Sequence, residues 1–192
     1  MQVSQVDFSA IAFSPFVATK GVKTSQATLN GAPVEFLLSD SEWYPAPFGA
    51  SAFNDEKATR LTLELDISKS PVLEVLGLAE AAIIKKAHEM GIFENQSLDD
   101  VTKTFKSSVA YSDKYTAFRW RTKLNTVGVK PCRFFLAPDK IKVPYDDLDL
   151  RHATVRPHIL FKGLWKQGGQ WGLQFEVLNL LVQPASDAPD PF

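Results

Sequence analysis

The chain has 192 residues, of which 45% are hydrophobic and 22% charged, with a net charge of −1. This length and composition predict one globular domain with a sizeable core. A single cysteine, Cys132, excludes an internal disulfide. The chain has neither a signal-like start nor an apolar run of 18 residues, so we expect a soluble, intracellular protein without membrane contact.

Charge is distributed unevenly along the chain. Residues 1–102 contain 7 Lys and Arg against 14 Asp and Glu, whereas residues 103–142 contain 10 against 2. The second segment therefore has a charge balance of +8. Such a block in an otherwise acidic protein favours a polyanion-binding site over a randomly solvated surface.

The N-terminal part of the chain has the pattern of strands and turns. Residues 1–17 are rich in apolar and aromatic side chains and predict a first strand. Asn30-Gly31 between two apolar runs predicts a type I′ hairpin. Residues 43–50 hold two prolines and a glycine and predict a loop, whose rings form either a stacking surface or part of the core. These rings are Trp43, Tyr44 and Phe48.

One more strand and two helices are predicted next. Apolar and polar residues alternate over 58–67, which is typical of a strand with one solvated face. Residues 70–90 predict the one long helix, because a serine and a proline suit its start and Gly91 follows its end. Its apolar side chains recur every three or four residues, which indicates a scaffold role. A shorter helix is predicted over 97–106.

Residues 107–124 return to the strand pattern and carry the most suggestive group of side chains. Aromatic and apolar residues occupy one face, and a cationic row with Tyr115 occupies the other. A groove for a single nucleic-acid strand needs cations that follow phosphates and rings that stack on unpaired bases. The alternative is a solvated cationic face with Phe118 and Trp120 in the core.

The sequence does not predict a catalytic or metal site. The histidines have no Cys or His at ligand spacing, and no glycine-rich phosphate loop occurs. Cys132 has no evident base beside it, which predicts a buried structural thiol. Asp146, Asp147 and Asp149 lack the glycine and glutamate of a calcium loop. We therefore expect neither an enzyme nor a cofactor or metal.

The C-terminal part of the chain predicts a strong hairpin. Residues 155–162 alternate between two faces, Gly168-Gly169 interrupts the pattern, and the alternation resumes from Trp171. After Val182 the composition changes abruptly. Residues 184–192 contain acids, prolines and a terminal phenylalanine, which predict a flexible acidic tail.

Two segments of this region, Lys162-Gly163-Leu164-Trp165 and Trp171-Gly172-Leu173-Gln174-Phe175-Glu176-Val177, flank the Gly-Gly turn. Together with the acidic tail ending in Phe192, they resemble the end of single-stranded DNA-binding proteins of phages and large DNA viruses. The resemblance covers roughly the last 40 residues. It implies an OB fold and sequence-independent binding of single-stranded DNA during DNA replication or recombination.

The expected fold is mainly β (α+β), a five-stranded OB-type barrel over residues 1–183 with a helical insertion at about 70–106 and a tail at 184–192. We expect Lys and Arg to bind phosphates and aromatic rings to stack on bases. The candidate nucleic-acid-binding residues are Lys106, Lys114, Tyr115, Arg119, Trp120, Arg121, Lys123, Lys130, Arg133, Lys162, Trp165, Lys166 and Trp171. Replication proteins (polymerase, helicase or primase) are the expected partners of tail residues Asp187, Asp190 and Phe192.

The sequence is also compatible with two alternative functions. A β-sandwich virion component would explain the strands and aromatic rings, but it would not explain the charge balance of +8 in residues 103–142. An RNA-binding OB protein would differ only in recognising the 2′-hydroxyl. A homodimer is also possible, and a viral protein would work in the host cytoplasm or nucleus.

Overall fold

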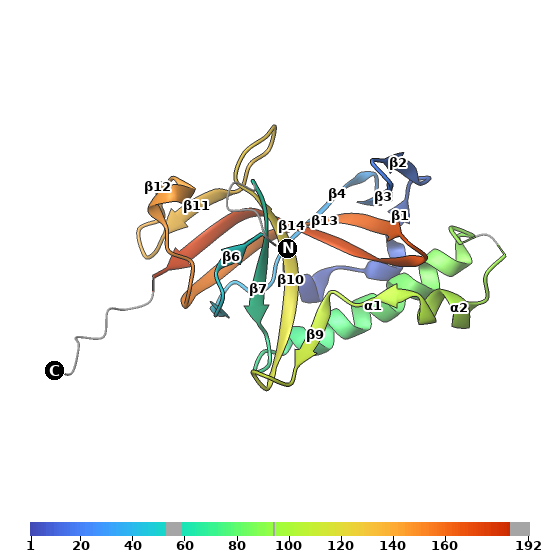
Figure 1. Cartoon of the computed structure of the whole chain (residues 1–192), viewed down its shortest axis with the longest axis horizontal. Helices are drawn as coiled ribbons and strands as arrows, with labels where there is room; N and C mark the ends of the chain where they lie inside the picture. Colours follow the sequence, from blue (N-terminus) through green and yellow to red (C-terminus); the bar gives the residue numbers. More distant parts are fainter. Residues whose placement is uncertain (53–58, 94, 185–192) are drawn as a thin grey trace.

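The computed structural model describes residues 1–52, 59–93 and 95–184. Its centre is a long antiparallel hairpin of β13 (Ala153–Gln167) and β14 (Gln170–Gln183), which crosses the molecule in Figure 1. The strands of this part of the chain join in one 14-stranded sheet. The shorter strands are β1 (Ala12–Phe13), β2 (Val17–Thr19), β3 (Val22–Leu29), β4 (Ala32–Leu37), β5 (Tyr44–Ala46), β6 (Ala50–Ser51), β7 (Arg60–Asp66), β8 (Phe105–Lys106), β9 (Val109–Ser112), β10 (Ala117–Asn125), β11 (Arg133–Leu136) and β12 (Ile141–Val143).

The hairpin organises the sheet because both of its edges are paired along their length. The edge of β13 that faces away from β14 pairs antiparallel with β3, β4 and β5. The edge of β14 that faces away from β13 pairs parallel with β8, β10 and β11. The main path runs β1-β3-β4-β13-β14-β10-β7-β6. Between described strands no pairing joins the two ends of this path, so the sheet is not a closed barrel there. The mainly β fold with two helices is confirmed at this coarser level.

Two predicted turns have the backbone that their sequences favour. Asn30 and Gly31 connect β3 to β4 with φ of +53° and +78°, and Gly168 and Gly169 connect β13 to β14 with φ of +57° and +79°. Two successive positive φ values are the mark of a type I′ turn, whose twist matches that of the flanking strands. Both hairpins follow from local sequence.

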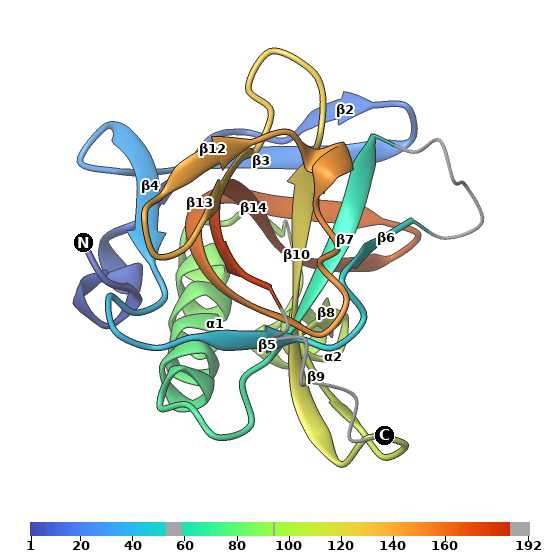
Figure 2. The ribbon, with the colours of Figure 1, turned by 90° about the vertical axis from the view of Figure 1, so that its left-hand side faces the viewer.

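The core lies on one side of the β13–β14 hairpin. Phe161 of β13 and Phe175 of β14 are buried with ring centroids 5.0 Å apart, and Trp120 of β10 lies 5.0 Å from Phe175. Helix α1 (Val72–Glu89) buries its apolar stripe in the same core, including Leu76 and Ile83. Figure 2 shows the strands curving round, with α1 to one side.

The two predicted helices are confirmed. The Ser70 hydroxyl accepts a hydrogen bond from the Val72 N–H at 3.2 Å at the start of α1. Helix α2 (Leu98–Lys103) begins with Ser97 accepting from the Asp100 N–H at 3.1 Å, and it ends earlier than predicted because the chain enters β8. No helix in the described ranges has the length and apolar character needed to cross a membrane.

Buried Glu80 attaches α1 to the sheet. Its carboxylate accepts hydrogen bonds from the Ser107 hydroxyl at 2.6 Å and from the Ser108 N–H and hydroxyl at 2.8 Å. The Ser108 hydroxyl in turn accepts from the Trp120 Nε1–H at 3.1 Å. A buried carboxylate needs such donors, so this network fixes α1 beside β10.

Three predicted segments differ from the structure. Residues 1–17 form two 3₁₀ turns (Val3–Gln5 and Phe8–Ala10), the short β1 and the first residue of β2. Most of their apolar side chains are buried in the core, including Phe8 and Ile11. Residues 107–124 form a hairpin of β9 and β10, because Thr116 turns the chain with φ of +51°. Residues 43–50, predicted as a loop, contain β5 and the first residue of β6. A third 3₁₀ turn lies further along the chain at Tyr145–Asp147.

Candidate nucleic-acid interface

The sheet side opposite the core carries most of the predicted site residues. Cross-strand register places Glu64 opposite Arg121, and Lys123 between Thr62 of β7 and Glu176 of β14. Their neighbours along each strand, such as Leu63 and Leu124, lie in the core. We call this side the outer face and define it by Glu35, Thr62, Glu64, Lys106, Arg119, Arg121, Lys123, Arg133, Arg156, His158, Leu160, Lys162, Trp165, Gly172, Gln174, Glu176, Asn179 and Leu181.

Trp165 lies on the outer face above a glycine. It pairs with Gly172 across the hairpin, and Gly172 pairs with Lys106 of β8. A β-carbon on Gly172 would come within 2.9 Å of Trp165 Nε1 and 2.6 Å of the Lys106 carbonyl oxygen. Only glycine therefore leaves room for the indole in this position. The half-buried ring on β13 and Lys106 on β8 therefore lie on either side of Gly172 of β14.

A group of cations lies in the middle of the outer face. The Lys123 amino group donates to the Thr62 hydroxyl at 2.9 Å, and its pKa lies below the usual range because the group is partly buried and because Arg60 and Arg121 are close. Arg121 is exposed and donates through Nε to Glu64 Oε1 at 2.9 Å. This concentration of positive charge favours an anionic ligand.

Two further predicted cations extend the group along β14. Lys162, at a bulge of β13, lies with its amino nitrogen 3.0 Å from Glu176 Oε2. Its side chain is 44% exposed, whereas that of Glu176 is 8% exposed. Exposed Arg133 of β11 donates to Asn179 Oδ1 at 2.7 Å. The structure therefore brings Lys106, Arg121, Lys123, Arg133, Lys162 and Trp165 onto one face.

Arg119 is held by other side chains at the edge of this face. Its guanidinium carbon lies 4.4 Å from the Phe48 ring centroid and 4.2 Å from that of Tyr115. Its terminal nitrogens donate to Glu64 Oε2 at 2.9 Å and to the Ser112 hydroxyl at 2.8 Å. Arg119 is only 9% exposed, and its main role is structural: it connects the loop before β6 to the β9–β10 hairpin.

Two of the predicted stacking residues lie in the core. Trp120 is fully buried against Phe175, and Trp171 is 1% exposed with Nε1–H donating to the Val101 carbonyl at 2.7 Å. Trp171 also packs against Phe93 and Phe105, with ring centroids 4.6 and 4.8 Å away. The prediction that these indoles meet nucleic acid is wrong, because their neighbours exclude any ligand.

The remaining candidates lie elsewhere. Lys114 and the exposed Tyr115 sit in the turn of the β9–β10 hairpin, and Lys130 sits in the loop after β10, which projects at the opposite end of the molecule (Figures 1 and 2). Lys166 follows Trp165 and points to the other side of the hairpin, with its amino group 5.2 Å from the Phe93 ring. The tail residues Asp187, Asp190 and Phe192 fall outside the described residues.

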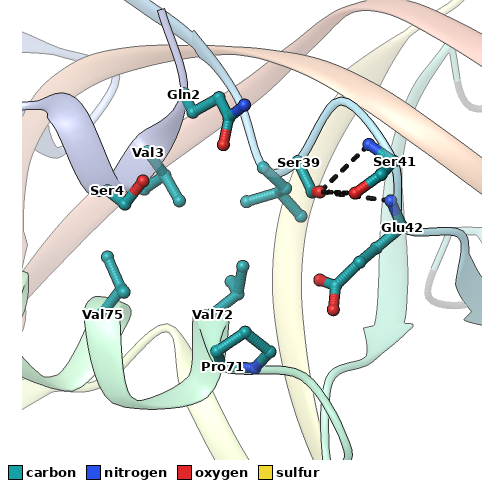
Figure 3. Close-up of a pocket in the computed structure, with 10 residues that line it drawn as sticks. Gln2, Val3, Ser4, Ser39, Ser41, Glu42, Pro71, Val72 and Val75 are labelled. Atoms are coloured by element: carbon teal, nitrogen blue, oxygen red, sulfur yellow. Dashed lines mark hydrogen bonds between the residues drawn. The ribbon is translucent and has the colours of Figure 1, made fainter.

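A cavity of about 240 Å³ lies between the N-terminus and α1 (Figure 3). Its lining combines aliphatic side chains with serines, a glutamine and Glu42. Glu42 Oε2 already accepts hydrogen bonds from the Tyr44 hydroxyl at 2.8 Å and the Ser70 hydroxyl at 2.7 Å. No lysine or arginine is among the residues that line it, so this cavity does not suit a phosphate group.

Sequence reasoning missed the residues that support the predicted ones. Gly172 provides the floor for Trp165, and Phe48 provides the second ring around Arg119. Glu64 and Glu176 hold cations of the outer face. A glycine directly after a tryptophan in a strand was an available signal for the first of these, because glycine in a strand often marks a close approach. The others depend on contacts between distant segments.

Comparisons with known proteins give a structural likeness only. No protein-family model and no curated protein matches the sequence. The fold is similar to the single-stranded DNA-binding protein from bacteriophage Enc34 in complex with ssDNA, at 8% identity and a TM-score of 0.49, over 91% of this chain and 97% of that chain. It is also similar to gp2.5, a single-stranded DNA binding protein encoded by bacteriophage T7, at 10% identity and a TM-score of 0.44, over 82% of this chain and 96% of that chain.

Proposed function

We propose that the protein binds single-stranded DNA without sequence preference on its outer face, and that it acts in DNA replication or recombination of a phage or virus. In this proposal the sheet is a partly open OB-type barrel into which the segment with α1 and α2 is inserted. The protein performs no catalysis and needs no cofactor. Its outer face positions a strand through stacking and charge.

The observation that carries the proposal is the position of Trp165. Its indole lies above Gly172 with Lys106 on the next strand, and Lys162 lies three residues before it. A half-buried ring with flanking ammonium groups offers an unpaired base a stacking surface and its phosphates nearby cations. Every base has a face that can stack, so such a site does not depend on sequence.

Electrostatics supports the same face. Burial lowers the pKa of Lys123, and the nearby positive charges of Arg60 and Arg121 lower it further, so three cationic side chains lie close together there. A bound phosphate backbone would compensate them. The +8 balance of residues 103–142 supplies part of this charge, although the net charge of the chain is −1.

The proposal is tested by fluorescence titration with oligo-dT and with oligo-rU. We expect saturable quenching by oligo-dT, an affinity that falls with salt, and weaker binding of oligo-rU. Trp165→Ala should lower the affinity by roughly 1–3 kcal/mol while costing only about 1 kcal/mol or less of stability. Fluorescence anisotropy of a labelled oligonucleotide gives the affinity independently of the tryptophan signal.

Lys85→Ala is the matched control. Lys85 lies on α1 with a side chain 72% exposed, so its removal takes one positive charge from a surface other than the outer face. We expect unchanged affinity and an unchanged salt dependence in this variant. Absence of oligo-dT binding by the folded wild type, or tighter binding of oligo-rU, would overturn the proposed ligand.

We also propose that the acidic tail is a docking segment for replication proteins. Asp187 and Asp190 give it two negative charges at pH 7. Deleting residues 184–192 should strengthen binding of oligo-dT at low salt, since the tail no longer competes for the cations, and the gain should shrink as salt is added. The deletion should also abolish the capture of a polymerase, helicase or primase. Unchanged capture would remove the docking role.

A further inference from the structure

The outer face of the β13–β14 hairpin is continuous over its whole length. Two bulges interrupt the pairing, one at Lys162 in β13 and one at Leu178 in β14. Each bulge adds one residue and so shifts the alternation of its own strand by one. Arg156, His158 and Trp165 therefore share one side with their partners Leu181, Asn179 and Gly172. The site of Trp165 continues towards the other end of the hairpin.

Trp43 lies at that other end and is held by Arg156. The guanidinium carbon of Arg156 is 4.4 Å from the centroid of the Trp43 ring. Arg156 also donates to the Glu42 carbonyl oxygen at 3.1 Å and to the Ser41 carbonyl oxygen at 2.6 Å. These three contacts fix both the loop before β5 and the plane of the half-buried indole. A ring fixed in advance loses little conformational entropy when a base stacks on it.

Groups that suit a nucleic-acid strand lie between the two indoles. Lys162 is 44% exposed, and exposed Arg133 is oriented by its hydrogen bond to Asn179. The Asn179 amide also meets His158 Nδ1 at 2.8 Å, so the polar groups in the middle of the face are linked. Leu160 and Leu181 are partly exposed there and offer apolar contacts. Cations and apolar side chains thus lie along the path from Trp165 to Trp43, together with two acids, Glu35 and Glu176, which flank Leu160. Glu176 is paired with Lys162, and Glu35 Oε2 lies 3.5 Å from His158 Nε2.

We propose that Trp43 on Arg156 is a second base-stacking position, and that Trp43 and Trp165 mark the two ends of one binding site. This inference rests on the proposed function. Arg156 precedes Trp165 by nine residues, which is at most about 30 Å of strand. A stacked strand rises about 3.4 Å per nucleotide, so the two ends are joined by up to about nine nucleotides, and by fewer in an extended strand. This length lies within the range of roughly 4–16 nucleotides covered by OB folds.

The four tryptophans allow a direct test. Trp120 and Trp171 are buried and do not report contact, so Trp165→Phe leaves Trp43 as the responding indole and Trp43→Phe leaves Trp165. In this test both variants are titrated with oligo-dT of about 4 to 16 nucleotides, and quenching of the tryptophan fluorescence is followed. Anisotropy of labelled oligonucleotides measures the affinity. Each variant should be quenched by the longer oligonucleotides. The wild-type affinity should rise with length up to about nine nucleotides and then level off.

The Trp43→Ala variant distinguishes a role of Trp43 in binding from a purely structural role. It should weaken binding of the longer oligonucleotides about 5- to 150-fold and leave binding of the shortest ones unchanged, because these occupy the Trp165 end. Trp43→Phe keeps a ring on Arg156 and should restore both the affinity and the melting temperature. A purely structural Trp43 would instead lower the affinity for all lengths alike, in parallel with stability.

The possible failures are distinct. If labelled oligonucleotides do not bind the wild type, the proposed function fails and the second position fails with it. If they bind and quench Trp165 but leave the fluorescence of the Trp165→Phe variant unchanged, only the second position is overturned. A wild-type affinity that stops rising before the strand can span both rings would also overturn it.

Discussion

The two sides of the β13–β14 hairpin use the same residue types for different purposes. On the inner side Trp171 is 1% exposed, and its Nε1–H donates to a backbone carbonyl of α2. On the outer side Trp165, six residues earlier, lies half-buried over Gly172 beside a lysine. An indole that is enclosed and hydrogen-bonded stabilises the fold, whereas one that is partly exposed is available to a ligand. The surroundings of each ring decide its role.

The largest effect should come from a core ring. Trp120→Ala removes a fully buried side chain from contact with Phe175 and takes away the donor that Ser108 accepts from. We expect a loss of roughly 3–5 kcal/mol in the free energy of unfolding, measured by urea denaturation. Trp165→Ala should cost about 1 kcal/mol or less. Equal losses in the two variants would remove the distinction between the sides.

Arg119 and Arg121 of β10 provide a second test of the difference between enclosed and exposed side chains. Arg119 is 9% exposed between two rings and Glu64, so Arg119→Ala should lower the free energy of unfolding by roughly 1.5–3 kcal/mol and leave the salt dependence of oligo-dT binding unchanged. Arg121 has a side chain 59% exposed, so Arg121→Ala should cost less than about 1 kcal/mol of stability. The same change should reduce the slope of log affinity against log salt by about 0.7. The opposite pattern would place Arg119 at the phosphates.

Glu176 provides a test in which binding improves. Its carboxylate lies 3.0 Å from the Lys162 amino group. Glu176→Gln should free Lys162 for phosphate, raising oligo-dT affinity at low salt and making the salt slope steeper by up to about 0.7. The stability change should stay near 1 kcal/mol, because Lys162 is 44% exposed and can turn to water. Gln174→Glu, which adds an acid to the same face, should weaken binding, and an unchanged affinity in both variants would exclude Lys162 from the site.

The smallest effect concerns pH. Burial lowers the pKa of His158, although nearby Glu35 opposes this change and the N-terminus and Arg133 add to it. The unfolded chain, with a histidine pKa of about 6.5, therefore binds more protons than the folded chain just below that pH, and stability falls as the pH drops through this window. Protonation at Nδ1 would also remove the acceptor that faces the Asn179 amide. The wild type should lose more melting temperature between about pH 7.5 and pH 5.5 than His158→Gln does. Equal losses would show that His158 makes no contribution.

Local sequence determined the elements whose signals are self-contained. Asn30-Gly31 and Gly168-Gly169 specify their turns because glycine and asparagine tolerate positive φ. The stripe of α1, with Ser70 before it and Gly91 after it, specifies the long helix. Alternation along residues 155–162 and 171–177 separated an inner from an outer side, and the inner residues are buried as that pattern indicates. Each of these signals acts over a few residues.

Tertiary structure decided which rings and charges are accessible. Trp120 alternates with Arg119 and Arg121, so the pattern separates their sides, but only the packing of Phe175 and Ser108 shows that this indole is enclosed. Trp171 is enclosed because α2 and β8 fold over it, and neither element is near it in sequence. Arg119 is occupied because Phe48 and Glu64 arrive from distant strands. A period of two in the sequence reports that two faces differ, whereas burial depends on which other segments come to lie on each face.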